Sequence, residues 1–253
     1  MASRASRIAS AVCGAVAVVG LSQSSQAQIF NDVQAELRVQ WMMMKREMPR
    51  HPNPEVQRFA ECIARAIIRV VPEEWQELDW EVIVFDNEAA NASVTPEGKI
   101  AVFSGILQVA NTPDKLAAVL GHEVAHLTEG HVRERVLRAA GTGLLGTLGG
   151  AVTGFGNESQ QVAQVMFQLP YQRSQENEAD ISGMELAARA GYNPAAALEI
   201  WRQMVAESGN RSEWLSTHPD PELRMRDMAA ELAPALAQYN EALDSGIRPL
   251  CDL

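Results

Sequence analysis

The order of apolar and polar positions along the chain predicts two helices followed by a small sheet. Residues 31–48 and 54–71 carry apolar side chains at helical spacing, and the proline-containing cluster 49–54 separates them. Residues 80–85 and 99–103 are rich in β-branched and aromatic side chains, and a turn-forming segment lies between them. We therefore expect two helices and then two short strands in the first part of the chain.

A further helix begins after the strands at a clear set of capping residues. Thr112 is a suitable N-cap, Pro113 occupies the first helical position, and Asp114 interacts favourably with the helix dipole. The spacing of apolar positions predicts a helix that continues to about Ala140. Its apolar stripe consists of Leu116, Val119, Leu120, Val124 and Leu127.

The first 27 residues have the pattern of a secretory signal peptide. Arg4 and Arg7 give a positive start, residues 8–21 are apolar, and Ser25-Gln26-Ala27 fits the small-x-small cleavage pattern. Cleavage removes two arginines and no acidic residue, which changes the net charge from −11 to −13. This net negative charge argues against nucleic acid or an anionic membrane surface as an electrostatic partner.

The mature chain, residues 28–253, is long enough for one domain with a sizeable core. After the signal peptide, every apolar run is shorter than the roughly 18 residues that span a bilayer. Residues 141–156 hold seven of the chain's 17 glycines. We interpret this segment as a flap over a cleft or as a segment that touches a membrane, and the alternative is a helical hairpin packed in the core.

The predicted export places the cysteines in an oxidising compartment. Val12 precedes Cys13, whereas a lipoprotein signal needs a small residue there, so we favour ordinary cleavage, with lipidation as the alternative. Export then leaves Cys62 and Cys251, a pair that predicts one disulfide, with two free thiols as the alternative. We expect a periplasmic or otherwise exported protein, with peripheral contact to a membrane or to outer-membrane proteins as a further possibility.

The most informative motif is His122-Glu123-Val124-Ala125-His126, an HExxH sequence within the predicted helix. Positions i and i+4 project from one face, so both imidazoles reach one Zn²⁺ while Glu123 lies beside a metal-bound water. Zinc lowers the pKa of that water to about 7 and polarises a scissile carbonyl. Glu123 then takes the water proton and delivers it to the leaving amine.

Catalytic zinc usually takes a third protein ligand. His131 is close in sequence, but on a continuous helix it points about 140° away from His126, so we reject it as a ligand in favour of a helix-surface or supporting role. In the predicted helix that runs to about Gly191, Glu176 and Asp180 share a face, whereas Glu178 points elsewhere. Glu176 is therefore the candidate third ligand, and Asp180 is the candidate hydrogen-bond acceptor for a ligand imidazole. The alternative is a solvated acidic face.

The separated motifs together resemble the membrane-associated zinc endopeptidases of the HtpX, BepA and mitochondrial Oma type, which form metallopeptidase family forty-eight. The matching segments are His122–His126 followed by His131, the Glu176–Asp180 motif, the stretch from Asn91 to Ile100, and Ser216–Pro219. They extend from about Gln34 to Met228. The chain differs from this family at Gln172, where serine is common, and we expect a small member without the transmembrane helices of HtpX or the repeats of BepA.

The resemblance implies an α+β, mostly helical zincin domain of the gluzincin-like type, with a small sheet beside the HExxH helix. It implies one Zn²⁺ on His122, His126 and Glu176, with Glu123 as the catalytic base. A strand beside such a helix can hold an extended peptide by main-chain hydrogen bonds. We therefore expect Asn91, Ala92 and Val102 to contact a polypeptide substrate.

His218 lies in a loop just before a helix that begins at Asp220-Pro221. Three roles are open for it: a hydrogen bond to the transition-state oxyanion, occupation of the open zinc position at rest, or a solvent-facing position without function. Arg224 on the following helix is a candidate for bracing this loop.

Two classes of function fit the sequence. The first is an envelope zinc endopeptidase for quality control of misfolded or misassembled envelope proteins. The second is a chaperone-like binder of unfolded envelope proteins with weak or latent proteolysis. The intact Glu123 favours the first class.

Overall fold

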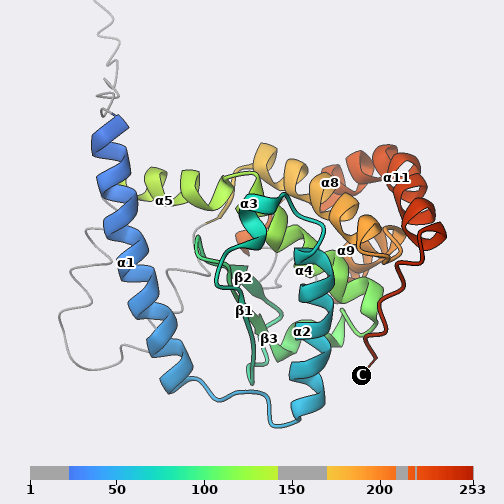
Figure 1. Cartoon of the computed structure of the whole chain (residues 1–253), viewed down its shortest axis with the longest axis horizontal. Helices are drawn as coiled ribbons and strands as arrows, with labels where there is room; N and C mark the ends of the chain where they lie inside the picture. Colours follow the sequence, from blue (N-terminus) through green and yellow to red (C-terminus); the bar gives the residue numbers. More distant parts are fainter. Residues whose placement is uncertain (1–22, 142–169, 209–215, 220, 253) are drawn as a thin grey trace, which may run out of the picture.

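The structure is a computed structural model that describes residues 23–141, 170–208, 216–219 and 221–252. Its described elements follow one another in the order shown in Figure 1. The helices are α1 (Gln23–Glu47), α2 (Pro54–Ile68), α3 (Glu73–Gln76), α4 (Pro113–Thr128), α5 (His131–Gly141), α8 (Arg173–Arg189), α9 (Ala195–Ser208) and α11 (Pro221–Asp244). The strands are β1 (Glu81–Phe85), β2 (Ala92–Val94) and β3 (Lys99–Phe103), and a 3₁₀ helix, η1, covers Ser104–Gln108.

The three strands form one sheet in the order β1-β3-β2. β1 pairs parallel to β3, and β2 pairs antiparallel to β3. The outer edge of β1 is covered, because the side chain of Gln57 bonds the backbone of Val82 (2.7 Å) and Val84 (2.9 Å). The two strands expected from the sequence are present, and the three-residue β2 was not predicted because it is too short to show alternation.

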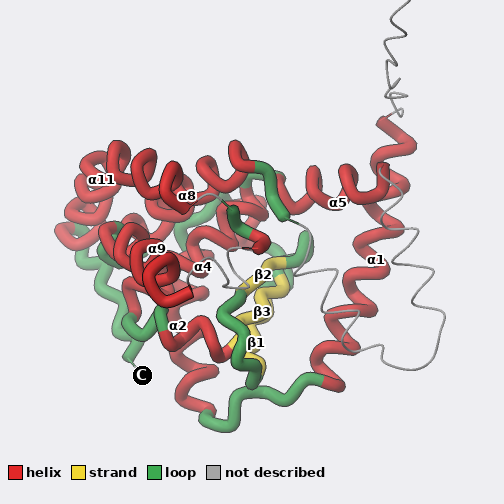
Figure 2. Tube along the Cα trace, turned by 180° about the vertical axis from the view of Figure 1, so that it is seen from behind, coloured by secondary structure: helices red, strands yellow, loops and turns green. Residues whose placement is uncertain are grey.

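Alternation along the strands divides the core into two parts. On one face, Val82 and Ile100 join the larger core with α2 and α4. On the other face, Phe85 and Phe103 pack against α1, where Trp41 meets Phe85 edge to face at 6.1 Å. Figure 2 shows the sheet between α1 on one side and α2 and α4 on the other. The prediction of a mostly helical α+β fold with a small sheet beside the HExxH helix is confirmed.

The helix with the HExxH motif begins as predicted but ends early. The Thr112 side chain accepts a hydrogen bond from the backbone nitrogen of Lys115 at 3.3 Å. The expected continuation to about Ala140 is wrong, because Gly130 adopts a φ of +80° and breaks the helix into α4 and α5. A left-handed residue at this position ends a helix, and glycine adopts it without steric cost. Consequently, His131 is not placed by the geometry of a continuous helix.

Helices α4 and α8 cross with their backbones in contact. A Cβ atom added to Gly121 would lie 2.6 Å from the carbonyl oxygen of Gly183, and one added to Gly183 would lie 2.6 Å from the backbone nitrogen of His122. Both distances are far below van der Waals contact. Only glycine at both positions allows α8 to approach the HExxH motif this closely.

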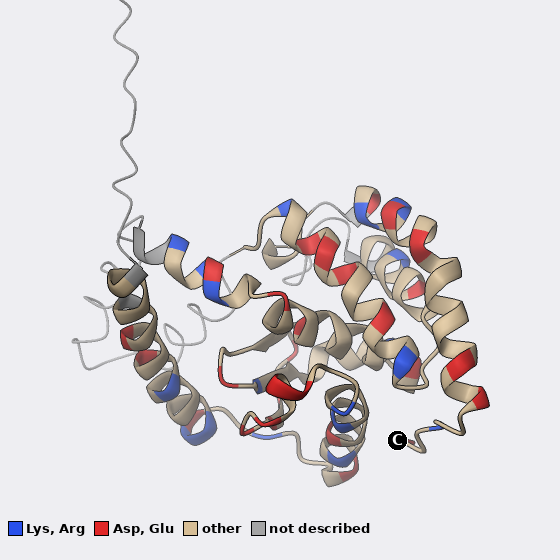
Figure 3. Ribbon diagram, turned by 45° about the horizontal axis from the view of Figure 1, so that its top comes forward, with Lys and Arg blue, Asp and Glu red and all other residues tan. Residues whose placement is uncertain are grey.

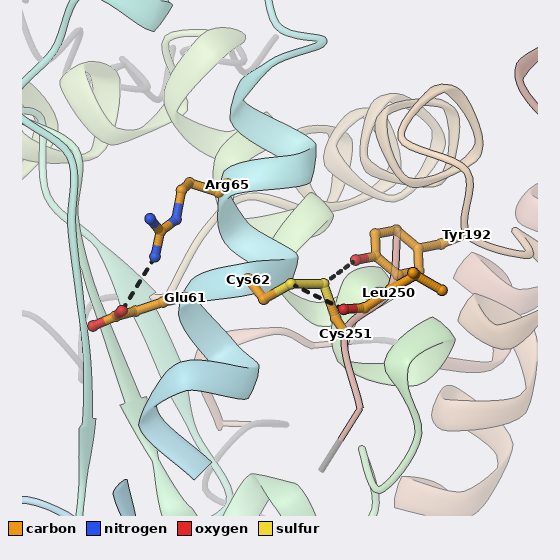
Figure 4. The surroundings of a disulfide bond; sticks show 6 residues. All are labelled: Glu61, Cys62, Arg65, Tyr192, Leu250 and Cys251. Carbon is orange, nitrogen blue, oxygen red and sulfur yellow. Dashed lines mark hydrogen bonds and ion pairs between the residues drawn. A yellow bond between two sulfur atoms is a disulfide. The ribbon is translucent and has the colours of Figure 1, made fainter. Parts of the chain in front are cut away.

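The end of the chain is fastened to α2 by a disulfide between Cys62 and Cys251, as the sequence predicted. Figure 4 shows the hydroxyl of Tyr192 donating to the sulfur of Cys251 at 3.3 Å. The bond joins residues 189 positions apart. A bridge across so long a segment stabilises the fold mainly by restricting the unfolded chain.

Several predictions fall wholly or partly outside the described residues. Residues 1–22 of the predicted signal peptide are among these, while the last part of that segment belongs to α1, which starts earlier than the expected residue 31. Of the glycine-rich segment, only Gly141 is described, as the last residue of α5. Among the described helices, none is both long and apolar enough to cross a membrane.

Gly183→Ala tests the helix crossing. Alanine favours a helix over glycine by about 1 kcal/mol, so without the crossing this variant would be more stable than the wild type. Because the added methyl meets the α4 backbone, we expect the free energy of unfolding in urea to fall by about 1–3 kcal/mol. Ser182→Ala, one residue earlier on α8, is the control and should change little. A Gly183→Ala protein as stable as the wild type would contradict the crossing.

Candidate metal centre

The HExxH motif places two imidazoles side by side in the interior. His122 and His126 lie one turn apart on α4, and their Nε2 atoms are 3.0 Å from each other. Both side chains are buried, as is Glu123 between them. One face of α4 therefore presents two ligand nitrogens at one point.

Helix α8 brings a carboxylate to the same point. The side chain of Glu176 is fully buried, and its oxygens lie 3.6 Å from Nε2 of His122 and 3.4 Å from Nε2 of His126. Glu178 is not part of this group, and its carboxylate lies 3.1 Å from His131. The candidate third ligand from the sequence thus lies beside the two histidines.

A fourth candidate ligand comes from the loop before α11. Nδ1 of His218 lies 3.1 Å from Nε2 of His122 and 3.0 Å from Oε1 of Glu176. His218 is only 2% exposed, so the solvent-facing alternative does not describe this structure. One ligand atom from each of His122, His126, Glu176 and His218 lies within 4.8 Å of the others.

The chemistry of these four groups fits a metal ion. Burial raises the pKa of Glu176 to about 7 and lowers the pKa of His126 well below its ordinary value. The neutral imidazole is the form that binds metals, so burial favours the form in which His126 is a ligand. A buried carboxylate against three imidazoles, in a group this compact, is a donor set suited to a divalent transition metal.

Asp180 holds the outer nitrogen of His122. Its Oδ1 lies 3.0 Å from Nδ1 of His122. Its carboxylate accepts two hydrogen bonds from the guanidinium of Arg224, at 2.6 and 2.7 Å. Burial alone would raise the pKa of Asp180, but the charge and hydrogen bonds of Arg224, aided by His122, outweigh it and lower this pKa to about 2. Asp180 is therefore ionised and can fix the ring of His122.

Arg224 connects the site to α9 and to the His218 loop. This fully buried residue of α11 also lies 2.5 Å from Glu176 and donates to the carbonyl oxygen of Pro219 at 3.4 Å. Its guanidinium stacks over the ring of Trp201 at 3.9 Å. The contact with Pro219, next to His218, fits the bracing role expected from the sequence.

Glu123 lies beside the four candidate ligands, on the side that faces the sheet. Its Oε1 is 3.6 Å from Nε2 of His218, and the backbone of Val94 on β2 bonds its carboxylate. Burial raises the pKa of Glu123 well above its usual value. A carboxyl group whose pKa is raised in this way exchanges a proton more readily near neutral pH, as a general base requires.

Two residues that the sequence did not single out support His126. The ring of Tyr171 stacks on the imidazole at 3.6 Å between centroids and 8° between planes. The guanidinium of Arg135 covers the opposite side of Tyr171 at 4.0 Å. Neither residue belongs to a recognisable motif, so only the three-dimensional arrangement reveals them.

The residues expected to contact substrate lie on the sheet. Ala92 begins β2, the edge strand beside α4, and Asn91 directly precedes it; both are buried in this structure. Val102 lies opposite Ala92 in the central strand, with its side chain fully buried in the core. This position gives no support to a substrate contact by Val102.

Comparison with known proteins gives consistent matches. The model of peptidase family M48 matches residues 50–232. The mitochondrial metalloendopeptidase OMA1 of Schizosaccharomyces pombe is 34% identical over 188 residues, which cover 68% of this chain and 53% of that protein. OMA1 of Saccharomyces cerevisiae is 32% identical over 174 residues, covering 65% of this chain and 50% of that protein.

A bacterial relative is similar over a comparable region. The β-barrel assembly-enhancing protease of Escherichia coli is 26% identical over 175 residues, which cover 62% of this chain and 36% of that protein. The chain spans about half the length of the two OMA1 proteins and a smaller share, 36%, of the bacterial protein. These matches confirm the family resemblance that the sequence motifs indicated.

Proposed function

Because this chain belongs to peptidase family M48, we propose that it is a zinc-dependent endopeptidase. The observation that carries the proposal is the convergence of His122, His126 and Glu176 from two helices on one point, with Glu123 beside it. Two histidines and a glutamate are a known ligand set of catalytic zinc. The relatives named as metalloendopeptidases support the same reaction.

The mechanism assigns the proton transfers to Glu123. When bound, zinc supplies Lewis-acid chemistry, which acidifies water and polarises the scissile carbonyl. Glu123 accepts the proton of the attacking water and passes it to the leaving amine, a role that its raised pKa favours. Asp180 keeps the ring of His122 in place during the reaction, through the bond at 3.0 Å.

We assign His218 the role of a gate in the resting protein. Its Nδ1 lies 3.1 Å from His122 and 3.0 Å from Glu176, closer than the 3.6 Å between those two groups. This position supports His218 as an occupant of the fourth ligand position. A substrate then has to displace this imidazole before its carbonyl reaches the centre. The competing role is a donor to the transition-state oxyanion, in which His218 remains necessary for catalysis.

The substrates proposed for the enzyme are polypeptides, namely misfolded or misassembled proteins of the cell envelope. The Escherichia coli relative is named a β-barrel assembly-enhancing protease, which supports an envelope role. The disulfide between Cys62 and Cys251 supports an oxidising compartment such as the periplasm. Acidic residues occur on α1, α8 and α11 (Figure 3). Because negative charge repels nucleic acid, nucleic acid is not among the proposed partners.

Glu123→Gln tests the assignment of the base. The amide keeps the size of the side chain but cannot accept the water proton, so we expect the zinc content to stay near that of the wild type while cleavage of casein falls by at least about a hundredfold. Glu129→Gln, at the exposed end of the same helix, is the control and should cleave normally. Normal cleavage by a zinc-loaded Glu123→Gln protein would refute the mechanism.

His218→Ala separates the two roles of the loop histidine. A gate predicts that removing the imidazole raises the rate of casein cleavage several-fold, because one ligand position no longer has to be vacated. An oxyanion donor predicts a fall instead. His51→Ala, which removes a histidine from the turn before α2, is the control. If the cleavage rate falls for His218→Ala but not for His51→Ala, His218 is an oxyanion donor and not a gate.

A further inference from the structure

A chain of hydrogen-bonding groups leads from His126 to the surface of the protein. Nδ1 of His126 lies 3.1 Å from Nδ1 of His131. Nε2 of His131 lies 3.1 Å from a carboxylate oxygen of Glu178. His131 is buried, whereas the side chain of Glu178 is 57% exposed. The far side of a candidate metal ligand is thus connected to an exposed carboxylate through a single imidazole.

The directions of the protons along this chain follow from the ligand role of His126. Its Nε2 points into the candidate metal centre, 3.0 Å from Nε2 of His122. A ring nitrogen that binds a metal has no proton, so the proton of His126 is on Nδ1. His126 therefore donates to Nδ1 of His131, the proton of His131 is on Nε2, and Nε2 donates to Glu178. Each ring nitrogen of His126 and His131 then either donates or accepts, and each has one partner.

The local structure explains how His131 reaches this position. Gly130 turns the chain with a φ of +80°, and His131 is the first residue of the new helix α5. On α8, Glu176 faces the candidate ligands while Glu178, two residues later, meets His131. The break between α4 and α5 therefore gives His126 a partner that a continuous helix would have directed elsewhere.

We propose that His131 and Glu178 are positioning residues that fix the orientation and tautomer of His126 for metal binding, as Asp180 does for His122. The inference rests on the proposed function, since it assumes that His126 binds zinc. It assigns His131 the task of accepting the His126 proton and Glu178 the task of holding the His131 ring. Partners of this kind commonly change metal affinity by about 10- to 100-fold when they are removed.

The experiment measures zinc affinity by competition with a chelator, together with the melting temperature of the zinc-free protein. We expect His131→Leu to weaken zinc binding by about 10- to 100-fold, because leucine leaves the His126 proton without an acceptor. His131→Asn retains an acceptor oxygen near the position of Nδ1 and should recover most of that affinity. Glu178→Ala should reduce zinc affinity less than His131→Leu does, because solvent reaches this position and can accept the His131 proton.

Glu185→Ala is the matched control for Glu178→Ala. Glu185 lies two turns further along α8, and its substitution should leave zinc affinity unchanged. Equal zinc affinities of His131→Leu and the wild type would overturn the proposal. So would equal losses in His131→Leu and His131→Asn, since packing alone would then explain the effect. A wild-type protein that binds no zinc would refute the proposed function instead.

A second measurement keeps the proposal testable if His131→Leu does not fold. Long-range ¹⁵N–¹H spectra of the zinc-loaded wild type should show the His126 proton on Nδ1, protected from exchange with water. In Glu178→Ala the same proton should exchange faster, because the His131 ring is no longer held. A proton on Nε2 of His126, or an Nδ1 proton that exchanges as in a free imidazole, would overturn the proposal.

Discussion

The backbone contact between α4 and α8 is the constraint on which the rest of the site depends. Gly121 and Gly183 have no side chain at the crossing, so the two helix axes lie closer than any other pair of residues would allow. This approach brings Glu176 within 3.6 Å of both candidate ligand histidines and Asp180 within 3.0 Å of His122. The HExxH motif alone offers two nitrogens, and the crossing adds the carboxylates that complete the candidate metal centre.

Close packing of ionisable groups in the interior is costly unless the charges are balanced. Here Arg224 supplies the balance, because it contacts both Glu176 and Asp180 while its guanidinium stacks on Trp201. Helix α11 carries this arginine at its start, and the segment after α11 is fastened to α2 by the Cys62–Cys251 bridge. The disulfide beyond the far end of α11 therefore helps to hold Arg224, and its positive charge, in place beside the site.

The sequence predicted the parts of the site that depend on helical spacing. The pairs His122–His126 and Glu176–Asp180 follow from i, i+4 geometry, Glu123 follows from the HExxH motif, and the start of α4 follows from its capping residues. The end of that helix was not predicted: Gly130 is a typical helix-ending residue, but apolar positions continue beyond it at Val132 and Val136, and this pattern favoured one long helix. Tyr171 meets His126, and Arg135 meets Tyr171, only through folding, and no spacing along the chain shows that a ring will stack on an imidazole.

The crossing of α4 and α8 brings together His122, His126 and Glu176 as the proposed zinc site. Anomalous diffraction at the zinc edge, from crystals grown with zinc, tests it most directly. We expect one strong peak bonded to Nε2 of His122, Nε2 of His126 and a carboxylate oxygen of Glu176. A peak bonded to His131 in place of Glu176, or zinc bound only outside this group, would contradict it.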